Sequence, residues 1–270
     1  MKQDLTKFNE VDQQQAQQEH LLAFLDFANQ EPVALAWRRQ MLGLLNLKAG
    51  EAVLDAGCGE GFDTRMIFPL VQPGGRVVGA DISEFFLETG RKRAAAQGMA
   101  IEYQKADVMN LPFADATFDA ARVERLLMHV PDPAKAIAEL TRVVKPGGRL
   151  VAFDWDWDTF SIDADDPQFV RTATRLLSDG FKSGLIGRQL RATFQRAGLL
   201  DVQTVPGAQP FPWELMRQLL STLDRFVEQG LLSGEGLQAF WVDQEARMKS
   251  GCFSVAAMSF IAYGRKAPSQ

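Results

Sequence analysis

VLDAGCGEG, residues 53–61, is the stretch that decides the fold. Its apolar start is typical of a buried β-strand, and the segment DTRMIFPLV (63–71) that follows has helical spacing. Gly57, Gly59 and Gly61 stand between the two, where glycine lets the backbone turn tightly and brings its amide groups close to a ligand. The stretch therefore predicts a strand, a loop suited to ligand binding and a helix in direct succession.

The alternation of strands and helices continues after this stretch. Further strands are predicted at 75–83, 101–107, 118–124 and 149–155, and helices at 84–97, 125–130 and 133–144. Strands that alternate with helices of this length form a parallel, doubly wound sheet. We therefore expect an α/β fold of the Rossmann-like kind.

The parts of the chain outside this alternation are mostly helical. Residues 1–46 predict an N-terminal helical cap, and residues 208–252 predict a helical insertion before the last strand. The core is then expected to comprise residues 47–207 and 253–270, with additional helices at 167–180 and 188–198 and strands at 199–207 and 253–266.

Composition excludes several classes of protein. Of the 270 residues, 46% are apolar and 23% are charged, as in ordinary globular proteins. The net charge of −5, with no run of Lys and Arg, argues against a nucleic-acid partner. No stretch is apolar enough for a signal peptide or a membrane span, and two cysteines do not make a disulfide framework. We expect a reduced, cytoplasmic setting, and the oligomeric state stays open.

Acidic residues at the ends of the predicted strands indicate which nucleotide binds. Ligands of open parallel sheets sit at the carboxyl ends of the strands. Asp81 follows Gly61 by twenty residues, where a carboxylate can accept hydrogen bonds from both ribose hydroxyls. Asp107 can receive an adenine amino group and Asp55 an amino group of the ligand. The glycine spacing, G-x-G-x-G, is one residue short of the dinucleotide fingerprint, so S-adenosylmethionine fits better than NAD; a purely structural tight turn is the other interpretation of the glycines.

These motifs, together with ADVMNLPFADATFDAARVERLLMHVPDPAKAIAELTRVVKPGGRLV (106–151), resemble those of class I S-adenosylmethionine-dependent methyltransferases. The resemblance is to enzymes of the ubiquinone and menaquinone pathways and of natural-product synthesis. It implies a seven-stranded sheet whose last strand is antiparallel. It also implies that the cofactor meets the following residues: Gly57, Gly59 and Gly61 at its methionine and ribose part, Asp81 at the ribose diol, Ile82 beside the adenine, Asp107 and Val108 at the adenine edge, and Val123 and Glu124 at the methionyl moiety.

The stretch FDWDWDTF (153–160) alternates carboxylates with tryptophans. A calcium loop starting at Asp154 would need Gly where Thr159 stands, so we expect no metal here. Asp154 falls instead at the carboxyl end of the fifth strand. An extended backbone sends the carboxylates to one face and Trp155 and Trp157 to the other. The stretch therefore predicts the wall of a substrate pocket, and a cluster of strand-end hydrogen bonds with core tryptophans is the alternative.

Methyl transfer requires alignment of the acceptor and, for a hydroxyl, phenol or acidic carbon, removal of its proton. His129 and Asp154 are the predicted catalytic residues, although His129 has a structural alternative as a helix-start residue. Similar sugar O-methyltransferases carry a His pair where this chain has Met128 and His129. Aromatic residues concentrate in the two helical additions, which favours a small apolar or aromatic acceptor.

Three functions remain open from the sequence. A small-molecule methyltransferase is favoured, with O-methylation slightly ahead of C- or N-methylation. The alternative is a methyltransferase-like protein that binds the cofactor without methyl transfer, such as a natural-product cyclase. An NAD-dependent oxidoreductase is disfavoured by the glycine spacing and by Asp107.

Overall fold

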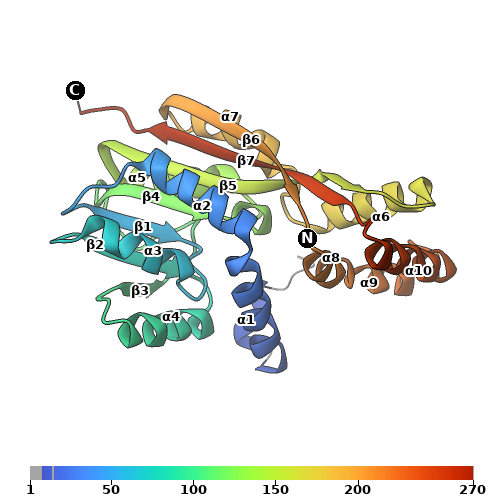
Figure 1. The fold of residues 1–270 in the computed structure, drawn as a ribbon. Coiled ribbons are helices and arrows are strands. Elements are labelled where there is room, and N and C mark those ends of the chain that lie inside the picture. Colours follow the sequence, from blue (N-terminus) through green and yellow to red (C-terminus); the bar gives the residue numbers. More distant parts are fainter. Residues whose placement is uncertain (1–7, 14, 270) are drawn as a thin grey trace.

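The structure is a computed structural model that describes residues 8–13 and 15–269. A seven-stranded sheet with the order β3-β2-β1-β4-β5-β7-β6 runs through the molecule (Figure 1). Strand β7 is antiparallel to both of its neighbours, whereas β1 to β5 pair in parallel. The predicted Rossmann-like fold with an antiparallel last strand is thus confirmed. The strands are β1 (Ala52–Ala56), β2 (Arg76–Asp81), β3 (Glu102–Lys105), β4 (Phe118–Glu124), β5 (Val144–Ile162), β6 (Leu200–Pro210) and β7 (Val255–Arg265).

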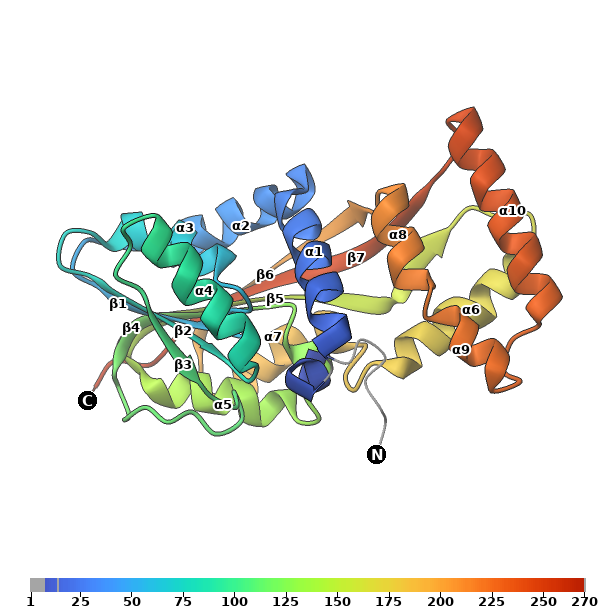
Figure 2. The same cartoon turned by 90° about the horizontal axis from the view of Figure 1, so that it is seen from below.

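Helices cover both faces of the sheet. Figure 2 shows α2 and α3 on one side and α5 and α7 on the other. Because both faces are covered, the apolar residues of the central strands are buried on either side, and Val53, Leu54, Ala120 and Ala121 are fully buried. The helices are α1 (Gln15–Gln30), α2 (Pro32–Leu45), α3 (Phe62–Val71), α4 (Glu84–Ala96), α5 (Pro133–Val143), α6 (Pro167–Gly180), α7 (Ile186–Arg196), α8 (Trp213–Leu220), α9 (Leu223–Glu228) and α10 (Gly234–Ser250), with 3-10 turns η1 (Phe8–Gln13) and η2 (Leu127–His129).

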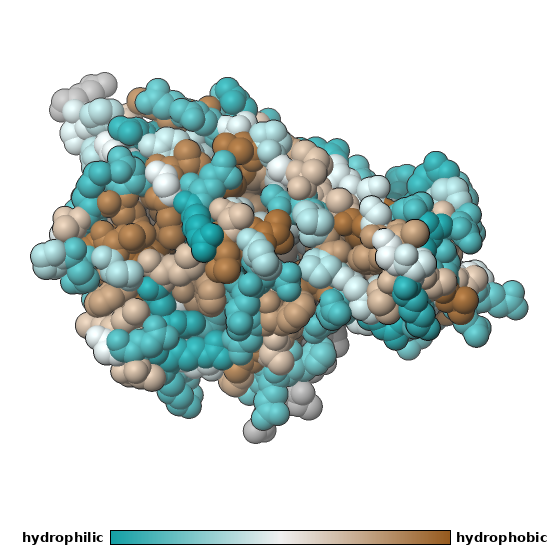
Figure 3. All heavy atoms as spheres, viewed as in Figure 1, coloured by the Kyte–Doolittle hydropathy of each residue, from teal (hydrophilic) through white to brown (hydrophobic). Residues whose placement is uncertain are grey.

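The two helical additions flank the sheet. Helix α1 lies beyond the carboxyl end of β1, and α8, α9 and α10 lie with α6 at the end of the molecule farthest from β3 (Figures 1 and 2). Residues 1–7 and 14 of the predicted cap lie outside the described residues. On the face drawn in Figure 3, apolar residues reach the surface in the middle of the molecule between polar ones. None of the described helices has both the length and the apolar character needed to cross a membrane.

Two local expectations were wrong. The helix predicted at 125–130 is only the three-residue turn η2, because Arg125 takes a left-handed conformation (φ 53°) directly after β4. Strand β5 does not stop at Trp155 but continues to Ile162, because β7 pairs with it along this extension, for example at Ser161 and Ala256.

Candidate active site

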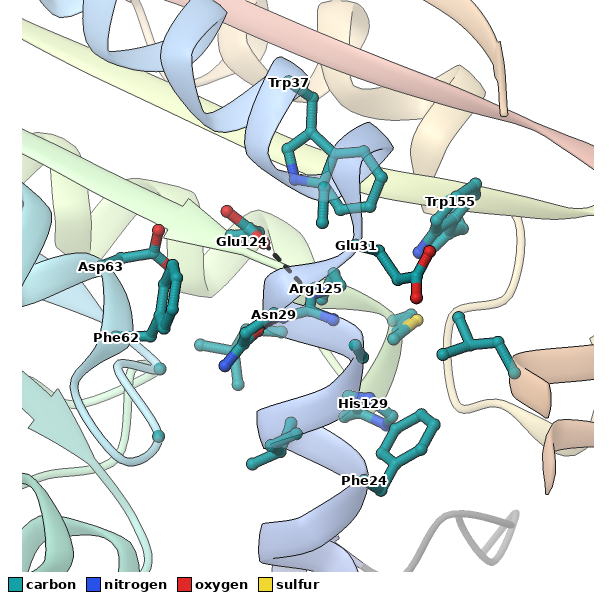
Figure 4. Close-up of a pocket in the computed structure, with 18 of the residues that line it drawn as sticks. Phe24, Asn29, Glu31, Trp37, Phe62, Asp63, Glu124, Arg125, His129 and Trp155 are labelled. Carbon is teal, nitrogen blue, oxygen red and sulfur yellow. Dashed lines mark hydrogen bonds and ion pairs between the residues drawn. The ribbon is translucent and has the colours of Figure 1, made fainter. Parts of the chain in front are cut away.

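A cavity opens at the carboxyl ends of β1, β4 and β5. The end of α1, the start of α2, the glycine loop, η2 and the segment before α8 surround it (Figure 4). Its lining divides into polar residues on the loop side and aromatic residues on the β5 side. The residues that line it include Phe24, Asn29, Glu31, Trp37, Gly57, Gly59, Glu60, Asp63, Asp81, Ile82, Glu124, Arg125, Leu126, Met128, His129, Trp155, Trp157, Phe181 and Phe211.

The glycine loop is shaped by left-handed backbone conformations. Gly57 has φ 70°, and a Cβ there would lie 2.7 Å from Leu126 Cδ2, which is closer than contacting carbon atoms allow. Gly59 has φ 52°, and its amide donates to Asp81 Oδ2 at 2.9 Å. The loop is thus held to β2 by the carboxylate that ends that strand. Both glycines line the cavity.

Gly61 has a different place from the one expected. It is the N-cap of α3, with φ 78°, and it lies against the ring of Tyr103, which leaves no room for a Cβ. The hydroxyl of Tyr103 is in turn 2.8 Å from Thr64 Oγ1. Gly61 lines neither the main cavity nor its smaller neighbour. Its smallness therefore serves the packing of β3 on α3.

A smaller cavity adjoins the first on the far side of Asp81. Asp107 and Val108 line it, together with Ile82, which is 45% exposed. The carboxylate of Asp81 accepts hydrogen bonds from the amides of Gly59 and Ser83, each at 2.9 Å. Burial raises the pKa of Asp81, and these amide hydrogen bonds act in the opposite direction. Asp81, Ile82, Asp107 and Val108 are therefore brought together, as the sequence predicted.

A buried cluster of ion pairs lies under the loop side of the main cavity. Glu124 ends β4 and pairs with Arg38 at 2.8 Å, with Arg122, and with Arg125 at 3.2 Å. Burial alone would raise the pKa of Glu124, but the three guanidinium groups lower it to about 2. Glu124 is thus a permanent anion whose charge is already matched by the protein.

Asp55 and Val123 are not at the cavity. Asp55 is 1% exposed, and its carboxylate pairs with Arg122 at 3.2 Å instead of facing a ligand amino group. Burial raises its pKa to about 7, against the opposing effect of Arg122. Val123 is fully buried in β4. The expected ligand contacts of these two side chains are wrong. Strand β1 turns Asp55 to the face where Arg122 and Asp63 of α3 lie. Val123, the residue after Arg122 in β4, points to the opposite face of the sheet.

The N-terminal helices contribute residues that the sequence interpretation missed. Asn29 donates to Glu60 of the glycine loop at 3.0 Å, and it accepts from Arg38 and Arg125, each at 2.7 Å. Asp26 pairs with Arg93 of α4, which also reaches Glu60 at 2.8 Å. In the sequence, these contacts are indicated only by Asp26 and Asn29, polar residues that interrupt the apolar face of a predicted cap helix.

The β5 side of the cavity is aromatic. Trp155 and Trp157 line it, and Trp157 stacks on Phe181 at 4.8 Å between ring centroids. The indole nitrogen of Trp157 lies 3.0 Å from the sulfur of Met128. Phe211 packs against Trp155 at 4.9 Å. The tryptophans of the alternating stretch therefore form a cavity wall, as the sequence predicted.

The carboxylates of the same stretch point away from this wall. Asp156 forms an ion pair with Arg188 of α7, and Asp158 reaches the same arginine at 3.3 Å. Asp154 is 0% exposed and accepts hydrogen bonds from the amides of Met128 at 3.1 Å and Trp155 at 2.9 Å. The expected position of Asp154 beside the acceptor is thus wrong, because strand alternation turns its carboxylate beneath η2.

His129 does line the cavity, although it is only 4% exposed. Its ring lies 5.8 Å from that of Phe181, and Figure 4 shows it on the same side as Phe24 of α1. Asp154 fixes the turn that carries it by holding the amide of Met128. The structure therefore places one imidazole at the cavity and one buried carboxylate behind it.

Comparison with known proteins identifies this arrangement. Residues 54–152 match the family described as "Methyltransferase domain". A Streptomyces fradiae protein, the "Uncharacterized 37.1 kDa protein in transposon TN4556", is 34% identical over 252 residues, which are 92% of this chain and 72% of that protein. The demethylmenaquinone methyltransferase of Symbiobacterium thermophilum is 37% identical over 120 residues, 44% of this chain and 48% of that enzyme. The chain belongs to the class I S-adenosylmethionine-dependent methyltransferases.

Solved structures agree with this methyltransferase in fold. The Bacillus subtilis YcgJ protein superposes with a TM-score of 0.60 at 22% identity, over 86% of this chain and 98% of that one. The [4+2]-cyclase SpnF superposes with a TM-score of 0.55 at 20% identity, over 87% and 82%. The match to the demethylmenaquinone methyltransferase spans about half of that enzyme's length. The sequence likeness to that enzyme therefore covers 44% of this chain, whereas the likeness in fold to the two solved structures covers most of it.

The cavities fit the cofactor of this family, S-adenosylmethionine. Gly57 lines both cavities, and a Cβ there would collide with Leu126, so only glycine lets the loop lie this close to that side chain. The smaller cavity is apolar apart from Asp81 and Asp107 and offers the exposed face of Ile82, which suits an adenine ring. Asp81 would hold the ribose hydroxyls, and the methionyl part would lie near Glu124 in the main cavity.

Proposed function

We propose that this methyltransferase transfers a methyl group to a small, apolar or aromatic acceptor, with O-methylation ahead of C- or N-methylation. The observation that carries the proposal is the aromatic wall formed by Trp155, Trp157 and Phe211, which continues directly from the loop side of the cavity. Flat apolar walls with few polar groups suit aromatic ligands. A cytoplasmic setting and the absence of a nucleic-acid partner, both inferred from composition, belong to the same proposal.

The chain's residues would act by orientation and proton transfer. The cofactor supplies a methyl group that is already activated on a sulfonium. Trp155 and Trp157 would hold the acceptor ring, and His129 would accept the proton of its hydroxyl. Asp154 would act through the backbone: its bond to the amide of Met128 keeps η2, and with it His129, in place. We therefore assign Asp154 a positioning role and His129 the contact with the acceptor.

The helical additions would bound the acceptor. Phe24 and Trp37 from the proposed cap (1–46) and Phe211, just inside the proposed insertion (208–252), line the same cavity as the tryptophans of the core. A second function, cofactor binding without methyl transfer as in a cyclase, is compatible with the fold of SpnF. The imidazole in the cavity favours transfer over that alternative, because a proton acceptor has a direct use in O-methylation.

Mass spectrometry tests the proposal. The purified protein would be incubated with S-adenosylmethionine and a panel of phenols, catechols, aromatic amines and enolisable ketones. We expect a product heavier by one CH₂ from a phenolic member, together with the demethylated cofactor. Product only from amines or carbon acids would contradict the preference for oxygen. Tight cofactor binding with no product from the panel, together with turnover of a polyene to a ring, would favour the cyclase.

A further inference from the structure

Glu31 is a carboxylate in the cavity that no group of the described residues uses. It occupies the N-cap position of α2, yet its side chain caps no amide of that helix. Among the described residues, none donates a hydrogen bond to its carboxylate or pairs with it. In Figure 4 the carboxylate points into the cavity on the side of Trp155. A half-buried anion among aromatic rings is costly unless something binds it.

The other carboxylates that line the cavity already have partners. Glu60 pairs with Arg65 at 2.9 Å and with Arg93 at 2.8 Å. Asp63 pairs with Arg38 at 2.9 Å and with Arg122 at 3.0 Å. Glu124 forms ion pairs with three arginines, and the carboxylate of Asp81 accepts hydrogen bonds from the backbone amides of Gly59 and Ser83. Among the described lining residues, Glu31 is thus the one acid left for a bound molecule.

The surroundings of Glu31 indicate what that molecule offers. Trp37, one helical turn and a half further along α2, and Trp155 of β5 line the same cavity, with ring centroids 5.6 Å apart. A carboxylate beside aromatic faces binds groups that donate hydrogen bonds, such as a hydroxyl, or an ammonium that also attracts the rings. Resting on the proposed function, we propose that Glu31 binds an O–H or N–H donor of the acceptor. The acceptor is then an aromatic or apolar molecule with such a polar end.

Two other roles for Glu31 make different predictions. Stabilisation of α2 by a negative charge at its N-terminus would affect only the stability of the fold. Binding of the cofactor's ammonium group would affect the affinity for S-adenosylhomocysteine, which keeps that ammonium. The proposed role affects neither of these but changes how the cavity distinguishes acceptors with and without a donor group.

The experiment uses three probes that share one ring system. Calorimetry would measure binding of 2-naphthol, 2-(aminomethyl)naphthalene and 2-methoxynaphthalene to the full chain saturated with S-adenosylhomocysteine, which cannot donate a methyl group. In the native protein, at least one of the two donor-bearing probes should bind about tenfold more tightly than the methoxy compound, as expected for a charge-assisted hydrogen bond. Comparison of the affinities for the naphthol and for the amine shows whether Glu31 prefers a neutral O–H donor or a cationic ammonium donor.

Glu31→Gln keeps the size of the side chain and removes its charge. We expect it to reduce the preference for the donor-bearing probe to less than threefold while the affinity for S-adenosylhomocysteine stays within threefold. Glu19→Gln, an identical change at an exposed position of α1, should retain the preference. Circular dichroism would verify that both variants are folded.

Three results would overturn the proposal. These are the absence of any preference in the native protein, a preference that survives Glu31→Gln, and a loss of cofactor affinity in that variant with the preference intact. The outcome is separate from that of the proposed function. A preference that depends on Glu31 would stand even if no methylated product were found, and methylation could be found with Glu31 playing no part.

Discussion

The side-chain amide of Asn29 donates a 3.0 Å hydrogen bond to Glu60 Oε1, so the last turn of α1 is tied to the glycine loop. The same asparagine accepts from Arg38 and Arg125, which both bind Glu124 at the end of β4. The N-terminal helices therefore do more than cover the acceptor. They form part of the polar layer on which the cofactor loop rests.

Asn29→Ala should weaken cofactor binding as well as stability. The change removes one hydrogen-bond partner each from the carboxylate of Glu60 and from the guanidinium groups of Arg38 and Arg125, which keep their ion pairs. We therefore expect the free energy of unfolding to fall by about 1–3 kcal/mol. Because Glu60 belongs to the glycine loop, affinity for S-adenosylmethionine should fall severalfold. Calorimetry and urea unfolding would measure both, with the exposed neighbour change Gln30→Ala as the control. Unchanged affinity would mean that the loop keeps its shape without the cap.

Asp81→Ala should have a larger effect on the cofactor. The substitution removes the predicted partner of the two ribose hydroxyls and also frees the amides of Gly59 and Ser83. We expect a loss of roughly 2–4 kcal/mol in binding free energy, since hydrogen bonds to charged groups are the strong ones. NAD should not bind to the native protein. Calorimetry that found NAD binding more tightly than S-adenosylmethionine would contradict the placement of the ribose at Asp81.

The sequence predicted those parts of the site that depend on local pattern. The glycine loop and Asp81 follow from where strands end, and the inward face of Trp155 and Trp157 follows from strand alternation. The burial of Asp55 could not be predicted in the same way. Its partner Arg122 lies 67 positions away, on a strand whose register with β1 is fixed by the packing of the whole sheet.

The misplacement of Asp154 has a related physical cause. The alternation of side chains along β5 correctly placed Asp154 on the face opposite to Trp155 and Trp157. It does not tell which of the two faces of the strand the turn η2 covers. The short turn in place of a predicted helix depends on the left-handed Arg125, a conformation that no local motif signals for arginine. Glu31 escaped notice because its significance lies in the lack of a partner among the described residues, which only three-dimensional contacts reveal.

Trp157→Phe should act on acceptor affinity and not on the rate at saturation. A phenyl ring retains part of the stack on Phe181 but loses the contact of the indole nitrogen with Met128 and part of the wall area. We expect KM for the acceptor to rise about tenfold with kcat within about threefold, and a stability loss of about 1–2 kcal/mol. Trp241→Phe on α10, outside the cavity, is the matched control. A fall in kcat at constant KM would mean that Trp157 acts in the transition state and not in acceptor binding.

Gly61→Ala should destabilise the fold mainly through one contact. The new methyl group would overlap the hydroxyl of Tyr103, and alanine is also disfavoured at φ 78° by about 1–2 kcal/mol. Tyr103→Phe removes the hydroxyl oxygen but not the backbone strain. The double variant should therefore be more stable than additive single effects predict, by more than about 0.5 kcal/mol in urea unfolding. Simple additivity would show that the hydroxyl is not what excludes a Cβ there, and would leave the ring carbons Cε1 and Cζ, each 2.8 Å from that Cβ, and the backbone strain as the causes.

Asp154 should make the stability of the protein depend on pH. Burial raises its pKa from 3.8 to about 7, while the amides of Trp155 and Met128 and the charge of His129 oppose the rise. Between these two values the folded state holds a proton that the unfolded state has released, so the contribution of this group to stability falls as pH rises from about 4 to about 7. Over this whole pH range, the free energy of unfolding should fall by an amount on the order of 4 kcal/mol because of this group.

Asp154→Asn removes this ionisation and keeps one acceptor oxygen. At pH 5 the variant should be less stable than the native protein by about 1 kcal/mol, because one of the two amide hydrogen bonds is lost. At pH 8 it should be at least as stable, since the native protein then bears the cost of a buried charge. Asp156→Asn breaks the ion pair with Arg188 and should destabilise at both pH values. Urea unfolding at pH 5 and 8 measures all four differences. If Asp154→Asn were destabilised equally at both, the buried carboxylate would be ionised throughout, and η2 would be held by a charge.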